Sequence, residues 1–305
     1  MNKYVLIFNS LKNKKLNKTI KGSIKMTDFE KVKQYYNKFD EKNRLINNNS
    51  GKLEFEMTMR ILKSYLNKKY KILDLGGGAG AYSFPLAKML NKVTLADLSP
   101  KLIEEARNKK DLEKVDNLIS CDIENAINLS YENDTFDVVL LFGPLYHLLD
   151  EDEREKCINE IYRVLKNGGL IFASFIPYLS GSIAIIDRYF RHNEQVNVDN
   201  LNKVFETGKF NNNSLSGFQE GYYPTLDEIK KLFSKNGFEQ IDMLSIRGIG
   251  YEKEDSLYNI KDKEMFNKII EIIEKTSRKE EIISMCGHAM YIGRKITIES
   301  NNLQR

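Results

Sequence analysis

Short apolar runs alternate with amphipathic stretches through the middle of the chain, and this alternation is typical of an α/β protein. The periodic stretches predict helices at 101–108 and 151–166, and the second of these ends at Asn167-Gly168-Gly169. The apolar runs predict strands of a parallel sheet at 71–75, 92–96, 118–121, 136–141 and 169–175. We therefore expect a doubly wound sheet with helices on both faces.

The two flanks of this core add further elements. Helical periodicity predicts helices at 31–39, 53–66, 226–235 and 265–275, the first two capping the sheet. The apolar stripe of the 265–275 helix favours packing over ligand binding. Two more strands are expected at 240–246 and 288–295, and the last should return antiparallel at the sheet edge. The sequence thus predicts a seven-stranded sheet.

The domain organisation follows from where the regular alternation starts and where it is interrupted. Residues 1–25 are rich in Lys and Asn and lack periodicity, so we expect a disordered basic extension that is dispensable. Residues 26–69 form the predicted N-terminal helical cap, and 70–298 form the main domain. Insertions at 178–223 and 248–287 interrupt the alternation and are expected to build a lid.

A glycine-dense turn follows the strand at 71–75. Gly76, Gly78 and Gly80 allow a sharp turn and close approach of a ligand to the backbone, where a Cβ would collide. Asp74, just before the turn, is well placed to hold an ammonium group. The turn also satisfies the loose dinucleotide fingerprint, so alone it does not separate a nicotinamide site from other nucleotide-like ligands.

Two more acids follow the next strands. Asp97 ends a strand about twenty residues past Gly76, where a carboxylate can accept both hydroxyls of a ribose. The alternative is that Asp97 only helps to start the helix that Ser99 caps. Asp122 follows the third strand, where it suits an adenine amino group with Ile123 against the ring. A plain turn aspartate is the alternative for Asp122.

The fourth strand, 136–141, leads into a loop that carries Tyr146 and His147. With this loop, the glycine turn and the two acids, the sequence resembles the signature series of class I S-adenosylmethionine (SAM)-dependent methyltransferases. The stretches 53–62, 143–148 and 287–295 resemble a bacterial group of that superfamily that methylates small molecules.

The resemblance implies a Rossmann-like sheet, SAM as cofactor and S-adenosylhomocysteine as product. The implied contacts begin with the methionine part, which the turn around Asp74, Gly76, Gly78 and Gly80 would hold. The remaining implied contacts are Leu141 and Gly143 at the methionine ammonium, Tyr36 over the methionine end, Asp97 with Leu98 at the ribose, and Cys121, Asp122 and Ile123 around the adenine.

Methyl transfer from a sulfonium depends chiefly on in-line positioning with water excluded, so a catalytic dyad is not required. His147 is the best candidate for a base, and a histidine satisfied in packing is the alternative. Tyr146, His147, Tyr223 and His288 are candidates for binding the acceptor. Aromatic filling under the lid is the alternative for the tyrosines. Arg247 stands where relatives lead us to expect an acid, which puts substrates inferred from them in doubt.

Charge and composition narrow the function. The net charge is +4, but residues 1–25 hold seven lysines and no acid, so the other 280 residues carry −3. This mildly acidic body makes a nucleic-acid partner unlikely, because such proteins carry basic patches on the folded body. Three scattered cysteines predict neither a metal site nor a disulfide framework and suit a reducing cytoplasm. No apolar run reaches the length of a membrane span.

The sequence therefore predicts a cytoplasmic methyltransferase that moves a methyl group from SAM to an O, N or S atom of a small molecule. The alternatives are a nucleic-acid or protein methyltransferase, a nicotinamide-dependent oxidoreductase and a non-catalytic SAM-binding module. The acceptor, the need for a base and the oligomeric state stay open.

Overall fold

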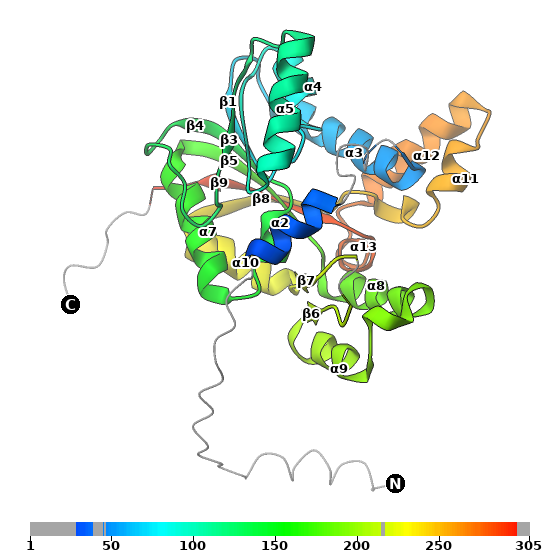
Figure 1. The fold of residues 1–305 in the computed structure, drawn as a ribbon. Coiled ribbons are helices and arrows are strands. Elements are labelled where there is room, and N and C mark those ends of the chain that lie inside the picture. The colour runs from blue at the N-terminus through cyan, green and yellow to red at the C-terminus, as the bar shows by residue number, and fades with distance from the viewer. Residues whose placement is uncertain (1–28, 39–44, 46, 215–216, 298–305) are drawn as a thin grey trace, which may run out of the picture.

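The computed structural model describes residues 29–38, 45, 47–214 and 217–297, with the side chains of 35–38 excepted. The predicted extension at 1–25 lies outside the described residues. A seven-stranded sheet forms the centre of the molecule (Figure 1). Its strands are β1 (Lys71–Leu75), β2 (Lys92–Asp97), β3 (Leu118–Ile123), β4 (Phe136–Leu141), β5 (Leu165–Phe175), β8 (Phe238–Ser245) and β9 (Ala289–Lys295).

The strands run in the order β3-β2-β1-β4-β5-β9-β8. The first five are parallel, and β9 is antiparallel to both of its neighbours. Leu75 at the end of β1 lies level with Ala96 in β2 and Leu141 in β4. The carboxyl ends of these strands therefore meet at one edge, where ligands bind in doubly wound sheets.

Helices cover both faces of the sheet, so the predicted doubly wound architecture is confirmed. They are α2 (Phe29–Lys38), α3 (Asn49–Tyr65), α4 (Ser83–Lys88), α5 (Pro100–Glu113), α6 (Pro144–His147), α7 (Glu151–Val164) and α10 (Leu226–Lys235). Buried residues of α3, α4 and α5 belong to one apolar core, and those of α7 and α10 belong to a second. Each face of the sheet thus has a core of its own, which holds the strand ends in fixed positions.

Two sequence predictions about the sheet are wrong in detail. The last strand, β9, is antiparallel as expected but lies inside the sheet, and β8 forms the edge. The strongly apolar run 289–293 is buried on both sides, which fits an interior strand. The helix expected to reach 166 ends at Val164, because β5 begins directly at Leu165 beside Phe136 of β4. Gly168 and Gly169 lie in that strand.

The first insertion follows β5 and forms a small unit. It contains α8 (Tyr178–Arg191), η2 (Asn193–Gln195), α9 (Val198–Thr207), β6 (Lys209–Asn211) and β7 (Glu220–Tyr222). These elements share a separate apolar core that includes Ile185, Val204 and Phe210. The insertion thus combines helices and a two-stranded sheet around an apolar core of its own.

The second insertion contains η3 (Gly248–Gly250), α11 (Glu254–Tyr258), α12 (Lys263–Thr276) and α13 (Glu280–Met285). Ile270 and Ile273 of α12 are buried in the core that α3 shares, which confirms the packing role expected for this helix. The insertion therefore extends the side of the molecule on which α3 lies (Figure 1).

Candidate active site

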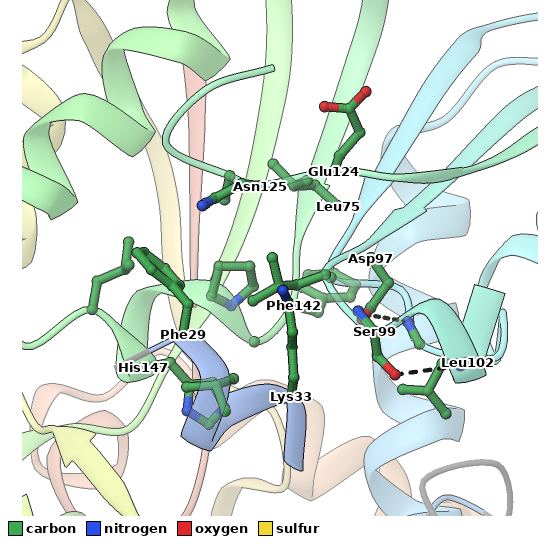
Figure 2. A pocket seen from close by; sticks show the side chains of 18 of the residues that line it. Phe29, Lys33, Leu75, Asp97, Ser99, Leu102, Glu124, Asn125, Phe142 and His147 are labelled. Carbon is green, nitrogen blue, oxygen red and sulfur yellow. Dashed lines mark hydrogen bonds between the residues drawn. The ribbon is translucent and has the colours of Figure 1, made fainter. Parts of the chain in front are cut away.

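A cavity that is partly open to solvent lies at the carboxyl ends of β1 to β4 (Figure 2). Four segments that follow strands line it, and helix α2 adds a fifth side. The lining residues that the sequence singled out are Gly76, Gly78, Asp97, Leu98, Gly143, Tyr146 and His147.

The glycine turn forms the floor of this cavity because it brings backbone close to the α6 loop. Gly76 has a positive φ of 78°, and a Cβ there would lie 2.7 Å from Cδ of Pro144. Its N–H donates to the Ala96 carbonyl at 2.8 Å. Gly80, with a φ of 88°, does not line the cavity, and a Cβ there would meet Phe84 at 2.8 Å. The turn thus needs glycine for its own geometry as well as for the ligand.

Asp97 is the carboxylate that the cavity exposes, and two backbone amides hold it in place. Oδ2 accepts from Gly78 N–H at 2.9 Å, and Oδ1 accepts from Ser99 N–H at 2.8 Å. A carboxylate oxygen can accept more than one hydrogen bond, so this side chain suits the two hydroxyls of a ribose. Asp97 therefore both supports the start of α5 and presents a fixed acceptor to the cavity.

Asp74 does not reach the cavity, which corrects the expectation that it holds an ammonium directly. Its side chain is fully buried beneath the turn, where Oδ2 accepts from Ser83 Oγ at 2.6 Å. Oδ1 has no hydrogen-bond partner among the described residues. Desolvation by burial raises the pKa of Asp74 to about 6, and the charge of Asp97 also raises it. The Asp74 carboxyl thus stabilises the glycine turn from beneath, through its hydrogen bond with Ser83.

The adenine segment also lies differently from the expectation. Cys121, Asp122 and Ile123 do not line the cavity. Oδ2 of Asp122 accepts from Ser120 Oγ at 2.8 Å and from the Tyr131 hydroxyl at 3.0 Å. The chain turns back toward the cavity only after β3 ends, and three later residues line it instead, which are Glu124, Asn125 and Ala126. The residues of this segment that line the cavity thus begin directly after the predicted ones.

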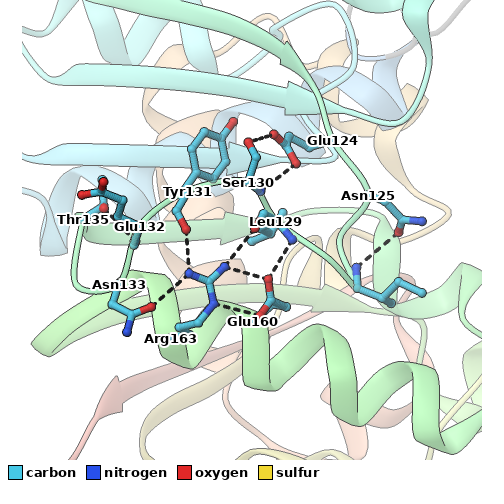
Figure 3. A network of polar contacts seen from close by, with 11 residues as sticks. Glu124, Asn125, Leu129, Ser130, Tyr131, Glu132, Asn133, Thr135, Glu160 and Arg163 are labelled. Atoms are coloured by element: carbon cyan, nitrogen blue, oxygen red, sulfur yellow. Dashed lines mark hydrogen bonds and ion pairs between the residues drawn. The ribbon is translucent and has the colours of Figure 1, made fainter.

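A side-chain network fixes the loop that follows these lining residues (Figure 3). Arg163 of α7 donates to the carbonyls of Leu129 at 3.0 Å and Tyr131 at 2.6 Å, and it pairs with Glu160 at 2.8 Å. Glu160 in turn accepts from the N–H of Leu129 at 2.7 Å. The Glu124 carboxylate turns away from the cavity to Ser130. The loop is therefore held in one shape from its far side.

Helix α2 supplies cavity residues that the sequence did not single out. Phe29, Val32 and Lys33 line the cavity, and Lys33 pairs with Glu30 at 2.8 Å. Their spacing places them on one face of the helix, and this amphipathic spacing was the available signal. The side chain of Tyr36, expected to close over the methionine end, lies outside the described residues.

After β4 the cavity is lined by Phe142, Gly143 and Pro144, whereas Leu141 lies inside the strand. Tyr146 and His147 follow on the short helix α6. His147 is buried, and desolvation lowers its pKa to about 4, although a hydrogen bond with the backbone of Glu220 opposes this. The imidazole is therefore neutral near pH 7.

Four aromatic side chains gather at this end of the cavity, and we call Tyr146, His147, Phe218 and His288 the ring cluster. Ring centroids of Tyr146 and His288 lie 5.8 Å apart with the planes nearly parallel, and Phe218 lies 5.3 Å from His147. His288 does not line the main cavity itself but stacks on Tyr146, which does.

Neither insertion contributes a lining residue to the main cavity among the described residues. The first insertion reaches the site through Phe218 in the ring cluster and through the backbone of Glu220, which contacts His147. Tyr223 is buried against Gly181, where a Cβ would lie 2.3 Å from its ring, so it packs inside the insertion. The expected contact of Tyr223 with an acceptor is corrected accordingly.

Arg247 is also explained by packing. Its guanidinium pairs with Glu254 at 2.7 Å, donates to Ser50 of α3 and lies over the ring of Tyr251. It does not line the cavity. Arg247 thus connects α3 with the second insertion. It does not contact the cavity, so its difference from the expected acid is no evidence about the acceptor.

Comparisons with known proteins agree with this geometry. A family described as "Methyltransferase domain" matches residues 73–173, the segment from the glycine turn to β5. The ubiquinone/menaquinone biosynthesis C-methyltransferase of Haemophilus ducreyi is 28% identical over 190 residues, which cover 60% of this chain and 70% of that protein. Residues 73–173 form a methyltransferase domain, and the fold is that of SAM-dependent methyltransferases. SAM is its cofactor.

Further relatives of this methyltransferase differ in how much they share. The 2-methyl-6-phytyl-1,4-hydroquinone methyltransferase 1 of Oryza sativa subsp. japonica is 39% identical over 102 residues, which cover 33% of this chain and 29% of that protein. A crystal structure described as a SAM-dependent methyltransferase from Methanosarcina mazei is 19% identical, covers 77% of this chain and 97% of its own, and superposes with a TM-score of 0.53. This last likeness supports the fold.

The residues present fit SAM. A cradle at Gly76 that a Cβ would fill and a fixed carboxylate at Asp97 are what a sugar and an amino-acid backbone require. Among the described residues, no helix of this methyltransferase has the length and apolar character needed to cross a membrane.

Proposed function

We propose that this methyltransferase transfers the methyl group of SAM in line to a small, hydroxylated conjugated ring such as a hydroquinone. The observation that carries the proposal is the course of the main cavity. It runs from the carboxylate of Asp97 to the ring cluster at Tyr146 and His147 as one continuous space. Aromatic side chains at its end suit a flat ring.

In this proposal, Gly76 and Gly78 hold the methionine part, Asp97 and Leu98 hold the ribose, and Asn125 faces the adenine. Gly143 approaches the methionine ammonium. SAM supplies an electrophilic methyl group on a positively charged sulfur. The protein positions that methyl at the ring cluster, where positioning supplies most of the rate enhancement.

The relatives support a ring acceptor and extend the choice of atom. Two of them are named for quinone or hydroquinone methylation, and one is named a C-methyltransferase. Carbon therefore joins the oxygen, nitrogen and sulfur that sequence reasoning considered. Phenolic rings are methylated at carbon or oxygen by the same displacement, so the ring cluster is compatible with either atom.

The test uses 1,4-naphthohydroquinone as the acceptor probe under reducing conditions with methyl-deuterated SAM. We expect a product heavier by one labelled methyl group, found by mass spectrometry, together with S-adenosylhomocysteine. Phe218→Ala should raise the KM for the probe at least fivefold, whereas the exposed Phe190→Ala, on the far part of α8, serves as the matched control. SAM binding without methylation of any phenolic or quinol probe would contradict this acceptor class.

A further inference from the structure

A carboxylate and an imidazole from opposite ends of the chain meet beside the ring cluster. Glu54 lies on α3 and is only 7% exposed. Its Oε2 lies 3.0 Å from Nδ1 of His288, which precedes β9, and the two residues are 234 positions apart. The side chain of His288 is 22% exposed, so solvent and small molecules reach the ring. A buried acid that contacts a reachable histidine is the arrangement that orients a general base.

We propose that His288 accepts the proton released by the methyl acceptor and that Glu54 is the residue that positions it. This assignment rests on the proposed function, because it concerns the acceptor end of the same site. It moves the base from His147, the residue that the sequence favoured, to a histidine about 140 positions later in the chain.

The contact with Glu54 selects the tautomer of His288. A carboxylate at Nδ1 accepts a hydrogen bond, so the neutral ring carries its proton on Nδ1 and keeps a lone pair on Nε2. No described residue forms a hydrogen bond with Nε2. Once protonated at Nε2, the imidazolium is stabilised by the negative charge of Glu54.

The position of His288 is defined by Tyr146. The two rings lie 5.8 Å apart with an angle of 17° between their planes, and Tyr146 itself lines the main cavity. An acceptor ring that enters the ring cluster beside Tyr146 therefore lies next to His288. A hydroxyl on that ring can then donate to Nε2 of His288, where the Glu54 contact leaves a lone pair.

His147 is less suited to the same role. It is 8% exposed, and burial lowers its pKa to about 4, which makes it a weak base at neutral pH. A hydrogen bond with the backbone of Glu220 opposes this effect of burial but does not cancel it. We assign His147 to shaping the wall of the cavity.

The reaction releases one proton, and such a group can accept it. For each methyl gained, the acceptor loses one proton, and the electron pair of the broken C–S bond remains on sulfur. SAM loses its positive charge in this step, and the released proton goes to Nε2 of His288. The partly exposed ring then passes that proton to solvent. No oxidant or reductant takes part.

Kinetics with 1,4-naphthohydroquinone separate a base from a structural residue. His288→Gly should lower kcat at least 100-fold while the Kd for SAM stays within twofold, and added imidazole should restore at least a tenth of the lost rate. Glu54→Gln should lower kcat about tenfold with the KM for the probe unchanged. His192→Gly, a change of an exposed histidine in the first insertion, is the control for unspecific effects.

Nuclear magnetic resonance reads the pairing without any acceptor, and only three histidines have to be assigned. In ¹⁵N-histidine-labelled protein we expect neutral His288 to carry its proton on Nδ1, and we expect Glu54→Ala to shift the proton to Nε2. An Nε2–H tautomer in the unmodified protein would overturn the assignment.

Two kinetic outcomes separate this inference from the proposed function. If the unmodified protein methylates the probe and His288→Gly does so at the same rate, His288 is not the base and the acceptor class still holds. If the unmodified protein binds SAM but methylates no phenolic probe, the acceptor class fails. The tautomer measurement then still decides whether Glu54 orients His288.

Discussion

The two ends of the cavity are built from contacts of very different range. At the cofactor end, Asp97 is held by amides of Gly78 and Ser99, which are 19 and 2 positions away in the chain. At the ring cluster, Glu54 and His288 meet across 234 positions. The cofactor end is thus determined by short turns at strand ends, whereas the acceptor end depends on how α3, the first insertion and β9 pack together.

This difference separates what the fold holds in common from what adapts it to one acceptor. The matching methyltransferase family covers residues 73–173, which include Gly78, Asp97 and Ser99 and stop before the first insertion. Phe218, Glu54 and His288 all lie outside that segment. We therefore expect changes at the cofactor end to alter SAM affinity, and changes at the ring cluster to alter turnover with little effect on SAM.

The largest expected effect tests whether the glycine turn is needed for the cavity or only for the backbone. Gly76→Ala places a Cβ 2.7 Å from Pro144 at a φ of 78°, so we expect SAM affinity to fall roughly 100-fold, about 2.7 kcal/mol. Gly168→Ala is the matched control, because Gly168 has a φ of 75° but nothing within 4 Å of the added Cβ. Equal SAM affinity in both variants by calorimetry would show that the turn is not part of the site.

One buried titratable group from each end gives a second test through the pH dependence of stability. The pKa of Asp74 is raised to about 6, so the folded state holds this proton more tightly and the free energy of unfolding falls between pH 4 and 6. The pKa of His147 is lowered to about 4, so the unfolded state binds that proton more tightly and the free energy of unfolding rises between pH 4 and 6.5. The two effects oppose each other in the unmodified protein.

Single variants should expose each contribution. Relative to the unmodified protein, Asp74→Asn should gain about 3 kcal/mol in free energy of unfolding as the pH rises from 4 to 6. In His147→Gln the free energy of unfolding should instead fall relative to the unmodified protein, by a similar amount. Denaturant unfolding at pH 4, 5 and 6.5 checks this. If the free energy of unfolding changes with pH in both variants as it does in the unmodified protein, these two groups titrate normally in the folded state.

A smaller effect is expected from the network behind the adenine segment. Arg163→Ala removes the contacts with the Leu129 and Tyr131 carbonyls, so the loop loses its fixed shape and SAM affinity should fall about tenfold. Arg60→Ala is the control, since Arg60 also pairs with two carboxylates, Glu56 and Glu274, but away from the cavity. SAM binding is measured by fluorescence or calorimetry. Equal SAM affinity in both variants would contradict this account.

The sequence predicted the sheet well, because its strands are signalled locally. β1 and β4 have the predicted bounds, and α10 spans 226–235 as predicted. The errors arise where tertiary contacts decide. Whether β9 or β8 is the edge depends on which strand pairs with β5, and neither strand's own pattern reveals that choice.

The site was predicted in the same uneven way. Asp97, Gly76 and Gly143 line the cavity because strand order brings strand ends together. Asp74 and Asp122 do not line the cavity. Their carboxylates accept hydrogen bonds from nearby side chains instead, Ser83 for Asp74 and Tyr131 for Asp122. The contact of Glu54 with His288 left no local signal, because neither residue's neighbours in the chain indicate the other.

The most direct test of the account is a calorimetric titration of the unmodified protein and of Asp97→Ala with SAM. Asp111→Ala, a change of an exposed aspartate on α5, is the control. We predict one SAM site per chain, binding at least tenfold weaker in Asp97→Ala, about 1.4 kcal/mol, and unchanged in Asp111→Ala. Equal affinity in all three proteins, or no binding of SAM by the unmodified protein, would contradict the assignment of this cavity.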